Sequence, residues 1–294
     1  MKIPTSLTRI PDIPIGKKLV INLWTVILVG LSVRCGYGFQ FLTAYACAFI
    51  HELAHTLCAR LLRIKISCIK LYPFGMCATL EGNYIKSSEK EFLVAIAGPF
   101  ASLILFWICD FASEFLPQTQ FVRDLNLWIC IINLIPSLPL DGGRILKSLL
   151  VPRFGIITAY NFMLKISRVI IALLGVSAVI LISVSRFNFS LILICAFLLQ
   201  NLCFEQRAVS IIAIKEILQS SQNEKDPSRL RTRVLTVRET DGAHKFLKKL
   251  NYDCYWIVCV TNSMGQICAT LTETQILSAL SQKGLLTKYK DITG

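Results

Sequence analysis

The amino-acid sequence predicts a multi-pass α-helical membrane protein with six transmembrane helices, followed by a small cytosolic α/β domain. Apolar residues make up 54% of the 294 residues and charged residues only 17%, whereas soluble domains carry about 25% charged residues. The mean hydropathy is +0.60, and the composition turns polar from about Ala208. We therefore expect a transmembrane domain over 1–207, a linker over 208–233 and the small domain over 234–294.

Charge and cysteine content narrow the class of protein further. The net charge is +13, yet the predicted outer loops carry only Arg34, Arg123 and Arg186. This asymmetry follows the positive-inside rule, places both termini in the cytosol and does not indicate nucleic-acid binding. The 12 cysteines include no C-x-x-C pair, which argues against a disulfide framework and a cysteine zinc cluster. The N-terminal residues show no cleavable signal pattern.

The six spans are apolar runs of about the length that a bilayer-crossing helix needs. They are predicted over Leu19–Val33, Phe39–Leu62, Phe92–Phe115, a broken stretch from Leu125 to Val151, Lys165–Val184 and Phe189–Phe204. Pro136 and Pro139 interrupt the fourth span. Irregular backbone at membrane depth is tolerated only around a protected or water-filled site, so the break indicates a functional site.

The second span carries an H-E-x-x-H motif from His51 to His55. Residues four apart share a helix face, so both imidazoles can point at one metal ion, with Glu52 beside them to hold a water. This arrangement suits two zinc ligands and a general base. A chance match is the alternative, but uncompensated polar groups inside a membrane span are costly. Cys58 shares the face, and we interpret it as packing rather than as a ligand.

A third ligand is expected on the broken fourth span. A catalytic zinc takes three protein ligands and keeps one position open for water. Asp141 is followed by Gly142 and Gly143, which let the backbone approach the metal-binding helix closely. We interpret Asp141 as the third zinc ligand; a helix-capping Asp after a proline break is the alternative.

Residues 64–83, between the second and third spans, alternate with a period near two, and Pro73-Phe74-Gly75 reads as a turn. They predict a β-hairpin at the inner membrane surface, with an amphipathic loop as the alternative.

The C-terminal residues predict a β-α-β-β-α unit. Its elements are expected over Val234–Val237, Thr240–Leu250, Tyr255–Thr261, Gln266–Leu271 and Thr272–Ser281. So small a unit buries little core alone, and we expect it to pack on a copy of itself, giving a homo-oligomer, or on the membrane domain.

The two motifs together resemble the site-2 protease family of intramembrane zinc metalloproteases. The N-x-x-P-x-x-x-x-D-G motif of that family is matched at Asn133, Pro136, Asp141 and Gly142. Ala97-Gly98-Pro99 resembles a further family motif, with Ser102 where related proteins often have Asn.

The C-terminal unit is similar to a cystathionine-β-synthase (CBS) motif, which after six spans resembles the sporulation branch of the family. Many CBS motifs hold a ribose with Thr/Ser-x-x-Asp, whereas Thr272 is followed at that spacing by Gln275. We therefore do not expect this unit to bind a nucleotide.

The resemblance implies a zinc metalloendopeptidase with one Zn²⁺ per subunit, held by His51, His55 and Asp141. Zinc would polarise the scissile carbonyl, Glu52 would move the proton of the attacking water, and Asn133 would hold substrate backbone or steady the oxyanion.

The inward course of the second span predicts that substrate enters from the cytosolic side, where the hairpin can pair with an extended strand. The sporulation branch implies a membrane-associated substrate, pro-sigma-K, inhibitory membrane proteins as partners, and the membrane around the forespore as location.

Two other classes of function are weighed. A zinc transporter would also carry intramembrane His and Glu, but the two motifs supply one closed site and no pathway of sites. An inactive relative that only binds membrane proteins is disfavoured, because all four positions for metal and proton chemistry are intact.

Overall fold

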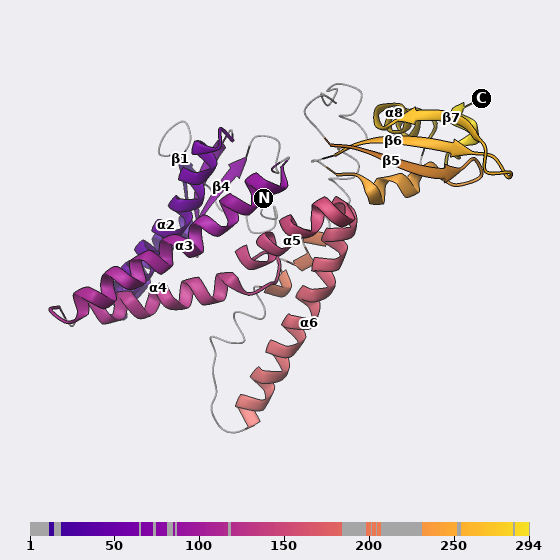
Figure 1. Ribbon diagram of the computed structural model, residues 1–294. Helices are drawn as coiled ribbons and strands as arrows, with labels where there is room; N and C mark the ends of the chain where they lie inside the picture. Colours follow the sequence, from indigo (N-terminus) through magenta and orange to yellow (C-terminus); the bar gives the residue numbers. More distant parts are fainter. Residues whose placement is uncertain are drawn as a thin grey trace. The chain divides into compact units, whose positions relative to one another are not determined.

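The structure is a computed structural model of the chain (Figure 1). It describes residues 12–14, 19–64, 66–72, 75–80, 85, 87–116, 119–183, 198–200, 202–203, 205–206, 231–251, 254–284 and 286–293. The chain divides into two compact units, Met1–Leu146 and Lys147–Gly294. The first unit contains both sequence motifs, and the second contains the C-terminal sheet.

A four-stranded sheet in the first unit has the order β1-β2-β3-β4. Its strands are β1 (Asp12–Pro14), β2 (Leu19–Asn22), β3 (Ile66–Tyr72) and β4 (Gly75–Leu80). β3 and β4 pair antiparallel, which confirms the predicted hairpin, and β2 pairs parallel with β3. β4 is the last strand in this order and pairs with β3 on one side, so its other side is a free edge of the sheet among the described strands.

The prediction of a first span over Leu19–Val33 is wrong at its beginning. Its first residues form β2, and helix α1 covers only Leu23–Arg34, twelve residues. Such a helix is about 18 Å long, which is shorter than the roughly 30 Å apolar core of a bilayer. A continuous apolar run does not separate strand from helix by its periodicity, and here pairing with β3 selects the strand.

Helix α2 (Gly38–Leu61) confirms the helix predicted from Phe39. Helix α3 (Ser88–Ser113) begins earlier than predicted, because the Ser87 side chain accepts a hydrogen bond from the Lys90 amide and caps its first turn. The predicted fourth span is two helices, α4 (Thr119–Leu134) and α5 (Asp141–Phe154).

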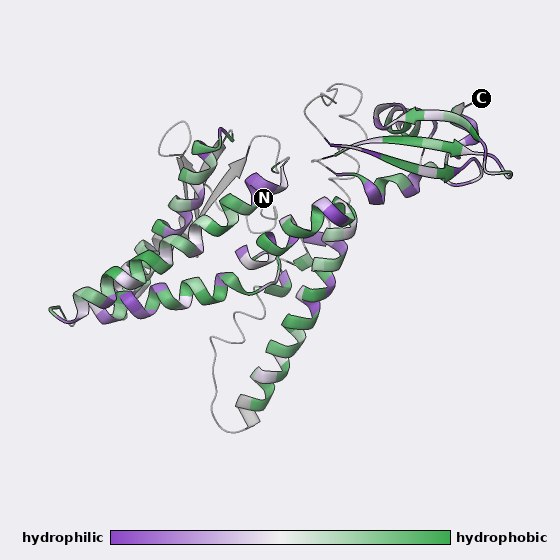
Figure 2. Ribbon diagram, viewed as in Figure 1, coloured by the Kyte–Doolittle hydropathy of each residue, from purple (hydrophilic) through white to green (hydrophobic). Residues whose placement is uncertain are grey.

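Two described helical segments are long and apolar enough to cross a membrane, Ser88–Ser113 in α3 and Ile156–Ile180 in α6. Figure 2 shows apolar residues along most of both helices. Trp107 and Phe111 on α3 are 62% and 71% exposed, a placement that suits contact with lipid rather than water. Six spans are not confirmed, and most of the predicted sixth, Phe189–Phe204, lies outside the described residues.

Helix α6 (Ile156–Ser183) follows α5 after a single residue, so it begins nine residues before the predicted fifth span, Lys165–Val184. Gly155 makes this elbow with φ 84°, a conformation that favours glycine. A Cβ there would lie 2.5 Å from the Lys248 carbonyl oxygen, so the elbow also requires glycine for space.

The C-terminal sheet confirms the predicted order of elements, with a 3₁₀ helix in place of the first α-helix. The elements are β5 (Arg231–Arg238), η2 (Ala243–Lys249), β6 (Cys254–Thr261), β7 (Ile267–Thr272), α8 (Glu273–Lys283) and α9 (Lys290–Thr293). β5 pairs parallel with β6, and β6 antiparallel with β7. Val258, Val260 and Ile276 are fully buried between the sheet and α8.

The chain around the end of η2 hydrogen-bonds the elbow between α5 and α6. The Leu250 carbonyl accepts from the Ile156 amide at 2.9 Å, and the Lys248 carbonyl accepts from Thr158 Oγ1 at 3.1 Å. Asn251 Nδ2 donates to the Val151 carbonyl at 3.0 Å. These bonds join the C-terminal sheet region to the beginning of α6 within the second unit.

Candidate metal centre

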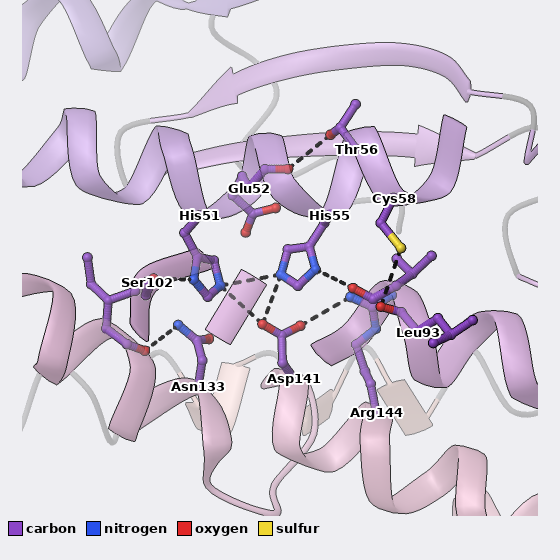
Figure 3. A network of polar contacts seen from close by, with 12 residues as sticks. His51, Glu52, His55, Thr56, Cys58, Leu93, Ser102, Asn133, Asp141 and Arg144 are labelled. Carbon is purple, nitrogen blue, oxygen red and sulfur yellow. Dashed lines mark hydrogen bonds and ion pairs between the residues drawn. The ribbon is translucent and has the colours of Figure 1, made fainter. Parts of the chain in front are cut away.

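Two histidines of α2 and the first residue of α5 meet in the first unit (Figure 3). His51 Nε2 and His55 Nε2 lie 3.1 and 3.0 Å from Asp141 Oδ2, and 3.3 Å from each other. All three residues are buried. Their ligand atoms lie within 4.8 Å of one another, so this group could hold a metal ion.

Helix α3 orients both imidazoles through their other ring nitrogens. His55 Nδ1 lies 2.6 Å from the Val94 carbonyl oxygen. A carbonyl only accepts, so Nδ1 carries the proton and Nε2 keeps its lone pair for a metal. His51 Nδ1 lies 2.9 Å from Ser102 Oγ, which is fully buried. Metal-binding histidines are commonly held in this way.

Gly98 lets α3 approach the two histidines. A Cβ at this position would lie 2.2 Å from His55 Nε2 and 2.7 Å from His51 Nε2, far inside van der Waals contact. From the sequence, Gly98 and Ser102 were noted only for the resemblance of Ala97-Gly98-Pro99 and its surroundings to a family motif. Their contacts with the histidines depend on how α3 packs against α2. The small residues around Pro99 were the sequence feature that could have indicated this close packing.

The space left by the missing side chains of the two glycines after Asp141 is taken by the segment that follows α4, and not by α2 as predicted. A Cβ on Gly142 would lie 2.2 Å from the Leu134 carbonyl oxygen, and one on Gly143 would lie 2.5 Å from the Ser137 carbonyl carbon. Both glycines therefore pack the beginning of α5 against the segment that follows α4. This packing fixes where Asp141 stands.

Glu52 lies on α2 beside the two imidazoles and is half-buried. Figure 3 shows its carboxylate on the α2 side of the rings, apart from the ligand atoms that meet at Asp141. Asn133 is near the end of α4, and its Nδ2 donates to the Ile129 carbonyl of the same helix at 2.9 Å. Cys58 Sγ donates to the Leu93 carbonyl at 3.4 Å and is not in the His–His–Asp group.

Arg144 is a further charged residue at the site. Its Nη1 donates to Asp141 Oδ1 at 3.2 Å, one helical turn along α5. Arg144 was not among the site residues predicted from the sequence, although it follows Asp141-Gly142-Gly143 directly.

The donor set fits zinc. Two imidazole nitrogens and one carboxylate oxygen are borderline ligands that zinc accepts, and three protein ligands are the number that a catalytic zinc uses. The protonated Nδ1 of His55 leaves the required nitrogen available on that ring.

Helices that bring an H-E-x-x-H pair and an aspartate into one buried group define the class of intramembrane metalloproteases. Residues 40–121 match the family described as Peptidase family M50. This part of the chain is therefore a Peptidase M50 (site-2 protease) domain.

Relatives agree with this family. The chain is 28% identical over 224 residues to "Zinc metalloprotease MJ0392" of Methanocaldococcus jannaschii, an alignment that covers 73% of this chain and 64% of the relative. It is 27% identical over 265 residues to "Stage IV sporulation protein FB" of Bacillus subtilis, covering 87% of this chain and 88% of that protein. The chain thus spans slightly less than two thirds of the archaeal relative.

A solved structure has the same fold. The "Site-2 Protease from Methanocaldococcus jannaschii" aligns with TM-score 0.50 and 23% identity, and covers 66% of this chain and 94% of that structure. At this identity the likeness establishes the fold alone.

Proposed function

We propose that this protein is a zinc metalloendopeptidase that cleaves a membrane-associated protein within or beside the membrane, near its cytosolic face. The observation that carries the proposal is the buried convergence of His51, His55 and Asp141. Family membership supports it, since residues 40–121 match a peptidase family.

The residues divide the chemistry among them. His51 and His55 would hold zinc through Nε2, and Asp141 through Oδ2. Bound zinc supplies Lewis acidity to the scissile carbonyl and to the attacking water. The Glu52 carboxylate takes a proton from that water and delivers it to the nitrogen of the leaving amine.

Asn133 would contact the substrate carbonyl. A side-chain amide has two N–H donors, and one of them bonds the Ile129 carbonyl. The second N–H would stabilise negative charge on the carbonyl oxygen as it develops.

Strand β4 would receive the substrate. It is a free edge among the described strands of its sheet, and an extended peptide can add to such an edge through main-chain hydrogen bonds. A substrate bound in this way is extended and not helical, so its peptide bonds are accessible to hydrolysis.

The sporulation-branch relative supports a narrower proposal. The substrate would be a membrane-associated transcription factor precursor such as pro-sigma-K, and inhibitory membrane proteins would control cleavage. The enzyme would cross the membrane six times with both termini in the cytosol, in a spore-former around the forespore. Its CBS-like unit would mediate homo-oligomer contact. Reporter fusions after Gly36 and Gly294 test the orientation.

Glu52→Gln tests the function. Gln is nearly isosteric but cannot accept the proton, and loss of general-base help costs about 10²–10⁴-fold in rate. We expect full zinc content, normal membrane insertion and accumulation of an uncleaved co-expressed substrate. Glu89→Gln, which removes an exposed carboxylate from the first turn of α3, is the matched control and should cleave normally.

The same cells distinguish a protease from a zinc transporter. A transporter would lose zinc uptake in Glu52→Gln, and no co-expressed membrane protein would change length. Normal substrate processing by Glu52→Gln would refute the proposed mechanism.

A further inference from the structure

The two carboxylate oxygens of Asp141 have different partners. Oδ2 faces both histidine Nε2 atoms, at 3.1 and 3.0 Å. Oδ1 accepts a hydrogen bond from Arg144 Nη1 at 3.2 Å (Figure 3). The Asp141 side chain is 7% exposed and that of Arg144 29%, so the ion pair is largely screened from solvent.

A carboxylate can bind a metal through one oxygen or through both. A guanidinium on Oδ1 opposes the second mode, because it occupies that oxygen with a charge-assisted hydrogen bond and places a positive charge against the cation. The site then keeps three protein donor atoms, and the remaining position stays open for water.

Other features of the site already account for an ionised, fixed Asp141. The carboxylate stands at the first residue of α5, where the helix dipole favours negative charge. Gly142 and Gly143 pack the same turn against residues 134–138. The contribution that only Arg144 makes is therefore the choice of oxygen.

We propose that Arg144 is a positioning residue that withholds Asp141 Oδ1 from the metal and so keeps a coordination position open. This inference rests on the metal site of the proposed function. It predicts that removal of Arg144 leaves metal affinity undiminished but raises the coordination number, because Oδ1 becomes a ligand and a repelling charge is lost.

Cobalt titration of the full-length protein in detergent tests the inference. Co²⁺ absorbs visible light more strongly with four ligands than with five or six. In Arg144→Ala we expect Co²⁺ to bind at least as tightly as in the wild type, with weaker absorption at saturation and proteolysis lowered about 10–100-fold. Arg144→Lys, which keeps a donor and a charge, should restore the absorption in large part.

Arg153→Ala is the control, because it removes an exposed arginine from the last turn of the same helix. It should leave the absorption and the affinity unchanged. If Arg144→Ala does not fold, Arg144→Gln, a neutral donor, takes its place with the same expectation in weaker form.

Two results would overturn the inference. The first is a wild-type absorption spectrum at saturation in Arg144→Ala. The second is a loss of Co²⁺ affinity in that variant, which would give Arg144 a merely structural role. Failure of the wild type to bind Co²⁺ is distinguishable from both, and it would refute the proposed function together with this inference.

Discussion

Gly98→Ala is the substitution whose effect the structure defines most closely. The new Cβ would lie 2.2 Å from His55 Nε2, 2.5 Å from His55 Cε1 and 2.7 Å from His51 Nε2. Ordinary contact begins near 3.4 Å, so the helix or the ring must move by about 1 Å. Neither moves easily, because Val94 and Ser102 of α3 hold the two rings from the same helix.

The cost falls on metal binding and on folding separately. Overpacking of a well-packed interior costs about 1–3 kcal/mol of stability. Loss of a partner that merely orients a ligand costs about 10–100-fold in metal affinity, and here the methyl group displaces a ligand atom itself. We therefore expect zinc affinity to fall by about 100-fold or more, which corresponds to about 2.7 kcal/mol.

Zinc affinity measured by competition with a chelator gives the result. Gly175→Ala is the matched control, because it adds a methyl group inside helix α6 with nothing within 4 Å. That control should bind zinc normally and should be neutral or more stable by up to about 1 kcal/mol. Unchanged zinc affinity in Gly98→Ala would show that α3 does not pack against the histidines as described.

Three further predictions follow from other parts of the chain. Asp141→Ala should lose bound zinc by metal analysis, since it removes one of the three candidate ligands. Full zinc occupancy would remove Asp141 from the ligand set. Cys77→Pro and Ala78→Pro should act differently, because neighbouring N–H groups of β4 point alternately to β3 and to the free edge. The variant that loses the N–H at the free edge should cleave substrate poorly while its zinc content stays normal. Normal cleavage by both variants would exclude strand addition. Burial raises the pKa of Tyr289 from its ordinary value of 10.0 to about 12. The unfolded chain therefore loses the phenol proton first, and stability should fall as pH rises from about 10 towards 12. A denaturant titration of Tyr289→Phe that shows the same pH dependence as the wild type would contradict this.

The three residues of the candidate metal centre could be singled out from sequence because their evidence is local or compositional. Four-residue spacing puts His51 and His55 on one helix face whatever the tertiary structure. Asp141 stood out through the proline break before it and the glycines after it. An acid in an apolar run is not enough, since Asp110 in α3 pairs with Arg123 at 3.2 Å instead.

Residues that orient the two histidines could not be predicted in the same way. The contact of Ser102 with His51 spans 51 positions and depends on the packing of α3 against α2. The same limit applies to β2, whose partner β3 lies more than forty residues further along the chain. Apolar composition alone made this strand look like the beginning of a helix.

The hydrogen bonds between the η2 region and the α5–α6 elbow bear on how truncated proteins are interpreted. Cutting the chain within 208–233 would remove the acceptor of the Ile156 amide and one of the two donors to the Val151 carbonyl, which also accepts from the Gly155 amide. A buried amide left without a partner costs about 1–3 kcal/mol. A shortened protein that has lost activity would therefore not by itself reveal a regulatory C-terminal domain, because the missing piece also completes the beginning of α6.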